Sequence, residues 1–225
     1  MDSVGIICEY NPFHNGHLYH INKCKELFPN QPIILILNGY FLERGELSIL
    51  SKEDKTKIAI TAGVDLVVEL PFVFGTQSAD IFAFNSVKLL DTLHVNKIVF
   101  GSESNDITLL ETVADYQLNN KEYDSKVKEL MSEGMNYPTA MAKALEIDAD
   151  ISSPNDLLGI SYIKAIKQIN NKMKYYTIKR TNDYHDTKSN NDVVSASNIR
   201  EKIKNHSDIK NFLPKYCLDK IKNVN

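Results

Sequence analysis

Short apolar runs recur along the chain, separated by longer segments in which apolar and polar residues alternate with helical periodicity. The runs are residues 4–8 (VGIIC), 32–37 (PIILIL), 65–70 (DLVVEL), 97–100 (KIVF) and 175–178 (YYTI). Continuous apolar runs of this length, bounded by turn residues, are typical of strands that are buried on both faces. We therefore predict five buried strands.

The segments between the runs favour helices, because their apolar residues return every three or four positions. In the first of them, Leu18, Ile21, Cys24 and Leu27 fall on one face. The further helices that we expect cover residues 51–62, 78–92, 108–118, 155–169, a stretch beginning at 195, and 208–225.

Two of these helices carry sequence signals of their own. Ser51 and Asp54 have the spacing of a capping box, and Gly63 is placed to end the same helix. The helix over residues 78–92 offers Ile81 and Phe82 for burial, among other apolar residues.

Residues 119–154 interrupt the alternation, because they are polar and helical in character and contain no strand signal. We predict one or two short helices there, inserted over the sheet, and a long polar loop over residues 181–194. The predicted organisation is one α/β domain over residues 1–205, followed by a C-terminal helix over residues 206–225 that begins a missing or reduced helical region.

Strands that alternate with helices imply a parallel sheet covered on both faces. Right-handed crossovers then make a doubly wound, five-stranded parallel sheet the expected α/β fold. In such sheets, ligands bind beyond the carboxyl ends of the strands.

Composition places the chain among ordinary globular proteins, with 225 residues, 43% of them hydrophobic and 24% charged. No apolar run approaches the roughly 18 residues that span a bilayer, and the N-terminus lacks a secretory signal. We expect no membrane association. The three cysteines, Cys8, Cys24 and Cys217, fit free thiols in a reducing cytoplasm, which is the expected location.

The net charge of −3 conceals an asymmetry. Residues 161–225 carry 14 Lys and Arg against 6 Asp and Glu, whereas residues 1–160 are acidic. A basic C-terminal third is compatible with a polyanionic partner. Solvated lysine-rich helix faces would give the same count, so charge alone does not decide between them.

The turn after the first strand has the features of an anion site. It contains Asn11-Pro12 and Asn15-Gly16, with His14 and His17 on either side of the glycine, and a helix follows at once. Backbone N–H groups and the helix dipole favour negative charge at such a place. The alternative is an ordinary turn that holds two histidines. A zinc site with Cys8 is disfavoured, because no CxxC or HExxH spacing supports it.

Other polar loops follow the other strands and therefore reach the same edge of the sheet. They are residues 38–46, residues 101–106 and the strand end at Arg180. Ser195, Ser197 and Arg200 begin a helix and could form a second phosphate cradle, although the serines could equally be N-caps. Two cradles on one edge suit a polyphosphate such as ATP. We take residues 40–50 as the candidate lid.

The residues of this turn carry a family resemblance. HNGH at residues 14–17 resembles the HxGH motif of the nucleotidyltransferase superfamily, and EYNPFHNGHLYHI at residues 9–21 resembles, more specifically, the tRNA(Met) cytidine acetate ligase family. Blocks similar to that family follow in the same order at residues 9–17, 38–46, 64–71, 100–103, 154–156, 179–180 and 195–200.

The resemblance implies an HxGH nucleotidyltransferase-like, Rossmann-like fold and an ATP-dependent ligase. Acetate would attack ATP, with Mg²⁺ as cofactor, and give acetyl-adenylate and pyrophosphate. The acetyl group would then pass to N4 of the wobble cytidine of elongator tRNA(Met). No metal-binding side chains are predicted.

The resemblance also implies roles for individual residues. The catalytic residues would be His14, His17 and Arg180. Those that bind ATP would be Ile7, Cys8, Glu9, Tyr10, Asn11, Pro12, Phe13, His14, Asn15, Gly16, His17, Leu18, Tyr19, His20, Gly101, Asn155, Arg180, Ser195, Ser197 and Arg200.

Two departures from the family pattern keep other functions open. The chain has Asn38-Gly39-Tyr40 and Glu43 where the family more usually has Ser-Gly-Asn and Gln, and the family's proteins are typically longer. One alternative is a generic HxGH adenylyltransferase acting on a small phosphorylated substrate. The other is a non-catalytic nucleotide-binding or RNA-binding relative. The sequence leaves the oligomeric state open.

Overall fold

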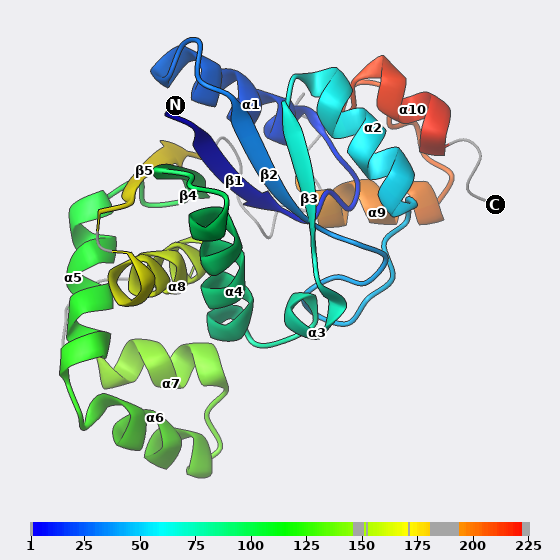
Figure 1. Ribbon diagram of the computed structural model, residues 1–225. Coiled ribbons are helices and arrows are strands. Elements are labelled where there is room, and N and C mark those ends of the chain that lie inside the picture. Colours follow the sequence, from blue (N-terminus) through cyan, green and yellow to red (C-terminus); the bar gives the residue numbers. More distant parts are fainter. Residues whose placement is uncertain (1, 146–150, 152, 171, 181–193, 222–225) are drawn as a thin grey trace.

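A five-stranded parallel sheet forms the centre of the computed structural model, which describes residues 2–145, 151, 153–170, 172–180 and 194–221 (Figure 1). The strands are β1 (Val4–Cys8), β2 (Ile33–Asn38), β3 (Leu66–Leu70), β4 (Lys97–Ser102) and β5 (Lys174–Lys179). Their spatial order is β3-β2-β1-β4-β5. All five predicted strands and the doubly wound arrangement are confirmed.

Ten helices connect and flank these strands in the described part of the chain. They are α1 (Asn15–Leu27), α2 (Lys52–Ala62), α3 (Phe72–Gly75), α4 (Ala79–Thr92), α5 (Ile107–Asn119), α6 (Tyr123–Ser132), α7 (Tyr137–Ala144), α8 (Pro154–Ile169), α9 (Ala196–Lys204) and α10 (Lys215–Ile221). The predicted ends of α2 are confirmed: Ser51 accepts a hydrogen bond from the backbone N–H of Asp54, and Gly63 ends the helix with φ of 100°.

The sheet is apolar on both faces because helices cover both. In β2, Ile34 and Ile36 pack into a core with α4, α5 and α8, whereas Ile33 and Leu35 pack on the opposite side with α1 and α2. The two cores explain why the strand has no polar face. Figure 1 shows the two helical layers on either side of the sheet.

The strands β1 and β4 separate toward their carboxyl ends. β1 pairs with β2 along all five of its residues, but its pairing with β4 covers only Val4 with Lys97 and Gly5 with Ile98. β1 lies where the chain reverses its direction of winding, which is the switch point of a doubly wound sheet. The divergence of the two strands therefore opens space at the edge where ligands bind in this fold.

Several sequence predictions are wrong in detail. The short helix α3 was not anticipated, and the last helix begins at Lys215 rather than 208. Leu27 and Ile81, expected to be buried, are 50% and 44% exposed. Both lie toward the solvent side of helices that bury other apolar residues, such as Ile21 in α1 and Phe82 in α4.

The segment 119–154 contains the two short helices that were predicted, but they do not lie over the sheet. Figure 1 places α6 and α7 beyond the ends of α4, α5 and α8. Tyr123, Val127 and Ala140 extend the core formed by those helices. The predicted loop 181–194 falls almost entirely outside the described residues.

At the other end of the chain, α10 packs against α2, and Cys217 and Ile221 are buried in the same core as β1. The predicted domain boundary near residue 205 stays a prediction. None of the helices that the structure describes combines the length and apolar character needed to cross a bilayer.

Candidate functional site

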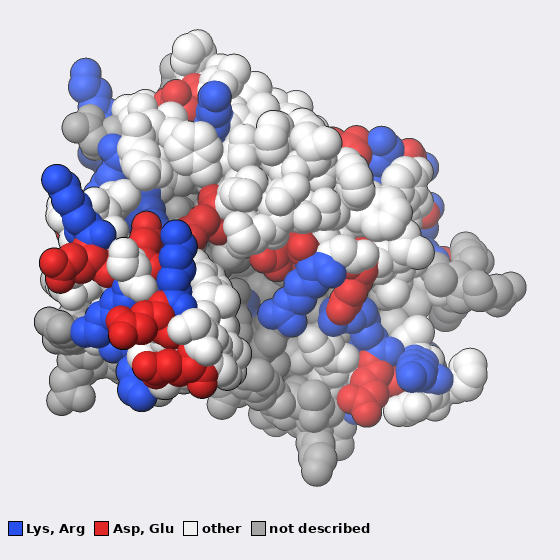
Figure 2. All heavy atoms as spheres, turned by 90° about the horizontal axis from the view of Figure 1, so that it is seen from below, with Lys and Arg blue, Asp and Glu red and all other residues white. Residues whose placement is uncertain are grey.

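A cavity of ≈ 490 Å³ opens at the carboxyl edge of the sheet, where β1 and β4 diverge. Its wall is built from the ends of β1, β4 and β5, the loop after β2, and the beginnings of α1, α4, α8 and α9, with part of α7. Figure 2 looks onto this edge and shows acidic and basic side chains intermixed around a central hollow. The face is therefore not a uniformly basic field.

The turn between β1 and α1 is held by a cluster of rings. Tyr10 is buried with φ of 52°, a left-handed conformation that costs energy for a bulky residue. Its ring lies 4.8 Å from that of Phe13 and 4.7 Å from that of His17 in edge-on geometry. This packing fixes the position of His17 before any ligand arrives.

Backbone contacts fix the orientation of both histidines. Nδ1 of His14 accepts a hydrogen bond from the N–H of Gly16 at 3.0 Å, and Nδ1 of His17 accepts one from the N–H of His14 at 3.2 Å. Since a neutral imidazole has one acceptor and one donor nitrogen, the proton of each ring lies on Nε2. The two rings, 3.9 Å apart, therefore offer Nε2–H donors.

Both histidines are neutral at pH 7. Burial, aided by the charge of Arg180, lowers the pKa of His14 to about 3. Burial also lowers the pKa of His17 well below its usual value, with contributions from His14, Arg180 and His20. The imidazoles can therefore offer neutral N–H donors, whereas the positive charge at the wall is carried by arginines and Lys179.

His20 contacts a backbone carbonyl of the sheet. Its Nε2 lies 3.1 Å from the carbonyl oxygen of Val99 in β4. That carbonyl lies beyond the residues through which β1 pairs with β4. Burial lowers the pKa of His20 to about 4, so its ring is neutral and can donate to Val99. His20 therefore bonds a backbone group in the gap between the two strands.

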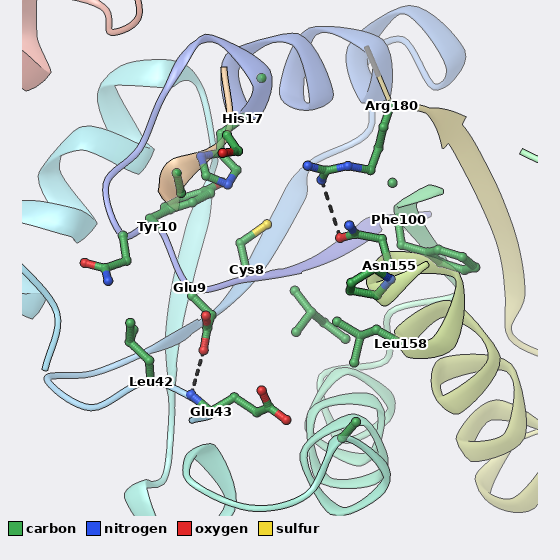
Figure 3. Close-up of a pocket in the computed structure, with 18 of the residues that line it drawn as sticks. Cys8, Glu9, Tyr10, His17, Leu42, Glu43, Phe100, Asn155, Leu158 and Arg180 are labelled. Atoms are coloured by element: carbon green, nitrogen blue, oxygen red, sulfur yellow. Dashed lines mark hydrogen bonds between the residues drawn. The ribbon is translucent and has the colours of Figure 1, made fainter. Parts of the chain in front are cut away.

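On the other wall, Arg180 at the end of β5 lies against the beginning of α8. Its guanidinium donates to Oδ1 of Asn155 at 3.4 Å (Figure 3). It also lies 3.4 Å from a carboxylate oxygen of Glu103. Asn155 in turn donates to Glu103 at 2.5 Å. A Cβ on Gly101 would come within 3.3 Å of Cγ of Arg180, so the glycine keeps this wall open.

The buried carboxylate of Asp156 supports that wall. It accepts hydrogen bonds from the hydroxyls of Ser102 and Ser153 and from the backbone N–H groups of Glu103 and Ser104. Burial alone would raise the pKa of Asp156, but these hydrogen bonds outweigh it and lower the pKa. The loop after β4 is thereby attached to the first turn of α8.

The N-terminus of α9 faces the same space. Ser195 caps the helix by accepting from the N–H of Asn198 at 3.1 Å, which is the N-cap alternative that the sequence left open; its predicted role in binding phosphate stays a prediction. Arg200 donates to the carbonyl of Asn11 at 2.9 Å and to the hydroxyl of Ser197 at 3.3 Å. Arg200 thus connects the N-terminus of α9 to the turn that precedes α1.

The loop after β2 closes the remaining side. The carboxylate of Glu9 accepts from the backbone N–H of Glu43 at 2.7 Å (Figure 3). Behind it, the fully buried Lys55 donates to the carbonyl oxygens of Glu9, Asn38 and Gly39 at 3.1, 2.8 and 2.8 Å. Burial lowers the pKa of Lys55 to about 8. One side chain of α2 therefore holds the ends of β1 and β2.

Most residues predicted for the site line this cavity together. They are Ile7, Cys8, Glu9, Tyr10, Asn11, His14, Gly16, His17, Tyr19, His20, Gly101, Asn155, Arg180, Ser195, Ser197 and Arg200.

Four predicted residues, Pro12, Phe13, Asn15 and Leu18, do not contribute to the wall. Phe13 is fully buried beneath the turn, and the side chain of Asn15 donates to the carbonyl of Asn211 at 2.8 Å. The functional roles of all these residues stay predictions.

Several wall residues were not predicted as site residues: Leu42, Asp80, Tyr137, Met141, Leu158, Ser161 and Tyr162. The sequence could have indicated Leu158 and Tyr162, because they follow Asn155 at helical spacing and so lie on the same face of α8. Tyr137 and Met141 carry no such signal, because they come from α7, which lies beyond the ends of α4, α5 and α8. Among the described residues, no group of three or more His, Cys, Asp and Glu side chains could hold a metal ion.

Comparison with known proteins gives matches over the whole chain. The family model for the HIGH nucleotidyl transferases matches residues 1–225. A curated protein of Mycoplasma mobile, named tRNA(Met) cytidine acetate ligase, is 42% identical over 94% of this chain and 72% of its own length. A protein of the same name from Fusobacterium nucleatum is 46% identical over 95% of this chain but 55% of its own length. The chain thus spans about half to just under three quarters of the length of these relatives.

Solved structures agree with the sequence comparison. The apo structure of Thermotoga maritima TmcAL superposes with a TM-score of 0.90 and 36% identity, over 99% of this chain and 56% of that one. A second structure, of the same protein bound with alpha-thio ATP, gives a TM-score of 0.85, 34% identity and coverage of 99% and 55%. The predicted family and fold are confirmed: this chain belongs to the tRNA(Met) cytidine acetate ligase family of HIGH nucleotidyl transferases.

Proposed function

We propose that this chain is an ATP-dependent ligase that activates acetate as acetyl-adenylate and acetylates N4 of a cytidine in tRNA(Met), the wobble cytidine of the elongator species. The observation that carries the proposal is the pair of helix N-termini facing one cavity, with the Nδ1 atoms of His14 and His17 held by backbone N–H groups. The names of the relatives, and the nucleotide-bound state of one solved neighbour, support the choice of reaction.

In the first step, an acetate oxygen attacks the α-phosphorus of ATP and pyrophosphate leaves. The Nε2–H groups of His14 and His17 donate to phosphate oxygens, while Arg180 and Arg200 supply positive charge to the triphosphate. Neutral histidines suit this task, since they stay donors across the working pH range. The catalytic roles of His14, His17 and Arg180 belong to this proposal.

Magnesium would supply the remaining positive charge to the leaving pyrophosphate. Mg²⁺ in such sites is held largely by substrate phosphates and water, with few protein ligands. A cavity with donors on two helix N-termini fits a nucleotide that arrives with its own ion. Modification of tRNA also fits the expected cytoplasmic location, which stays a prediction.

Two measurements test the proposal. Acetate as sole co-substrate is expected to support exchange of labelled pyrophosphate into ATP. Mass spectrometry of bulk tRNA after incubation with ATP, acetate and the protein should then detect N4-acetylcytidine. Exchange with a mononucleotide but not with acetate would instead identify a generic adenylyltransferase, and ATP binding without exchange would identify a non-catalytic relative.

A further inference from the structure

The cavity has two halves of opposite character. The half beside α1 and α9 carries the histidine donors, Arg180 and Arg200, and suits phosphate groups. The half beside the loop after β2 carries four carboxylates, of Glu9, Glu43, Glu46 and Asp80, and one guanidinium, of Arg44. Carboxylates outnumber the single guanidinium there, so an anion such as a triphosphate or acetate is favoured less in that second half than beside the histidines.

The carboxylate of Asp80 is bound by other side chains of the protein. It accepts from the hydroxyl of Ser161 at 3.0 Å and from the ammonium group of Lys164 at 3.1 Å, and Tyr137 contributes a longer contact. Glu46 lies 4.0 Å from Arg200, and both Glu46 and Arg44 are exposed, so the half-buried carboxylates left to a ligand in this half are those of Glu9 and Glu43.

Glu9 is held in a fixed position at the end of β1. Its Oε1 accepts from the backbone N–H of Glu43 at 2.7 Å and lies 3.5 Å from the amide of Asn38, and its carbonyl oxygen is held by Lys55. Within the described part of the chain, both hydrogen bonds to this carboxylate end on Oε1, which leaves Oε2 for a ligand. Figure 3 shows Glu9 beside Cys8, on the side of the space opposite Asn155 and Arg180.

The environment also suits proton transfer. Burial raises the pKa of Glu9 despite the opposing effects of the Glu43 N–H, Lys55, Arg44 and Arg200. Burial and the charge of Glu9 raise the pKa of Glu43. A carboxylate whose pKa lies closer to neutrality is a stronger base than an exposed one.

Cytosine presents the group that such a carboxylate recognises. Its N4 amino group is a donor, for which Glu and Asp are suitable acceptors, whereas uracil presents an O4 acceptor at the same position. A carboxylate therefore attracts cytosine and repels uracil. An enzyme that modifies a base takes it out of the stack into a pocket that reads this edge.

We propose that the carboxylate of Glu9 binds the N4 amino group of the acceptor cytosine and takes its proton during acetyl transfer, with Glu43 as a second acceptor for the same amine. This inference rests on the function proposed above. The N4 lone pair attacks the acetyl carbonyl carbon and an N–C bond forms. The C–O bond to the phosphate breaks, its electron pair leaves with AMP, and the N4 proton passes to Oε2 of Glu9. Glu9 is thereby assigned to the acceptor base rather than to ATP.

Glu9→Gln separates the two steps, because the amide keeps an oxygen acceptor for the N–H of Glu43 but cannot act as a base at neutral pH. We expect acetate-dependent pyrophosphate exchange to stay within about threefold of the wild-type rate. Acetyl transfer to tRNA in a single turnover should fall by about a hundredfold or more, the usual contribution of a general base. Glu43→Gln should lower transfer by less than about tenfold, since its backbone N–H still positions Glu9.

Glu69→Gln is the matched control. Glu69 also lies at the end of a strand, but it is exposed and pairs with Lys52 outside the cavity wall. It should leave both steps unchanged. Unchanged transfer in Glu9→Gln would overturn the proposal, and so would a loss of exchange as large as the loss of transfer, since Glu9 would then serve the nucleotide.

A binding measurement decides the proposal even if the protein forms no adenylate. Titrations with free cytidine and uridine are expected to show a preference for cytidine of about tenfold in the wild type and a smaller preference in Glu9→Gln. Equal affinity of the wild-type protein for the two nucleosides would refute the amine subsite. Failure of acetate-dependent exchange in the wild type would instead refute the ligase function, so the two failures are distinguishable.

Discussion

Asp156 is the residue whose replacement tests the structural account of the nucleotide wall most directly. Asp156→Asn keeps one oxygen acceptor and replaces the other with a donor. One of the backbone N–H groups, of Glu103 at 3.1 Å or of Ser104 at 2.9 Å, must then lose its partner. A buried unpaired donor costs about 1–3 kcal/mol.

The remaining hydrogen bonds weaken as well, because they no longer involve a charged acceptor. A loss of roughly 0.5–1 kcal/mol from each of these three, added to the cost of the unpaired donor, gives a total of about 2.5–6 kcal/mol. This is a large part of the roughly 5–15 kcal/mol by which domains are stable. Asn155, the neighbouring residue, should lose its fixed position beside Arg180, so ATP affinity should fall together with stability.

The assay is urea unfolding followed by far-UV circular dichroism, over a range of pH. Because the pKa of Asp156 is lowered in the fold, its contribution is present above the unfolded-state pKa of about 3.9 and is lost as pH falls through the lower folded-state value. The difference in unfolding free energy between wild type and Asp156→Asn should therefore be constant from about pH 5 to pH 8 and shrink below about pH 4.

Asp106→Asn provides the control for this substitution. Asp106 lies nearby but is exposed, and it caps α5 by accepting from the N–H of Leu109 at 3.0 Å. Asparagine is an equally good N-cap, so the control should change stability by less than about 0.5 kcal/mol. If Asp156→Asn were also within about 1 kcal/mol of the wild type, the role given to its carboxylate would be wrong.

Three further substitutions test other parts of the site. His17→Ala removes a phosphate donor and should abolish acetate-dependent pyrophosphate exchange, while near-native circular dichroism shows that the fold is kept; exchange at the wild-type rate would remove the role given to this ring. Gly101→Ala places a Cβ 3.3 Å from Cγ of Arg180, and we expect ATP affinity by calorimetry to fall about tenfold with little change in urea midpoint. Gly159→Ala places a Cβ 2.5 Å from the ring of Phe100. The added methyl group should cost about 1–3 kcal/mol through overpacking, which exceeds the gain of about 1 kcal/mol in helix propensity. We therefore expect a lower unfolding temperature, and a higher one would contradict the packing described.

The strands and the first anion turn could be predicted from the sequence because their signals are local. An apolar run such as Ile33 to Leu37 is a buried strand wherever it lies in the sheet, and Asn15-Gly16 before an amphipathic segment marks a helix start. Motif residues were brought together for the same reason, since parallel strands place all their following loops on one edge.

Other features depend on contacts that no local pattern encodes. The space between β1 and β4 arises because two strands distant in sequence pair over only two residues of β1. Tyr137 and Met141 reach the cavity because α7 packs beyond the ends of α4, α5 and α8, a tertiary arrangement that its own sequence does not indicate. Ile81 illustrates the converse error, because an apolar residue on a short amphipathic helix can equally face solvent.

Lys55 has a consequence for the chemistry carried out beside it. With a pKa of about 8, its amine is uncharged far more often near neutral pH than an ordinary lysine, and an uncharged amine attacks activated acyl groups. The acyl-adenylate proposed for the adjacent cavity would be such a group. Complete burial keeps Lys55 out of the cavity wall, and its three carbonyl partners accept from all three N–H bonds of the ammonium form, which has no lone pair. The contacts that join the ends of β1 and β2 would therefore also protect Lys55 from acylation by the proposed intermediate.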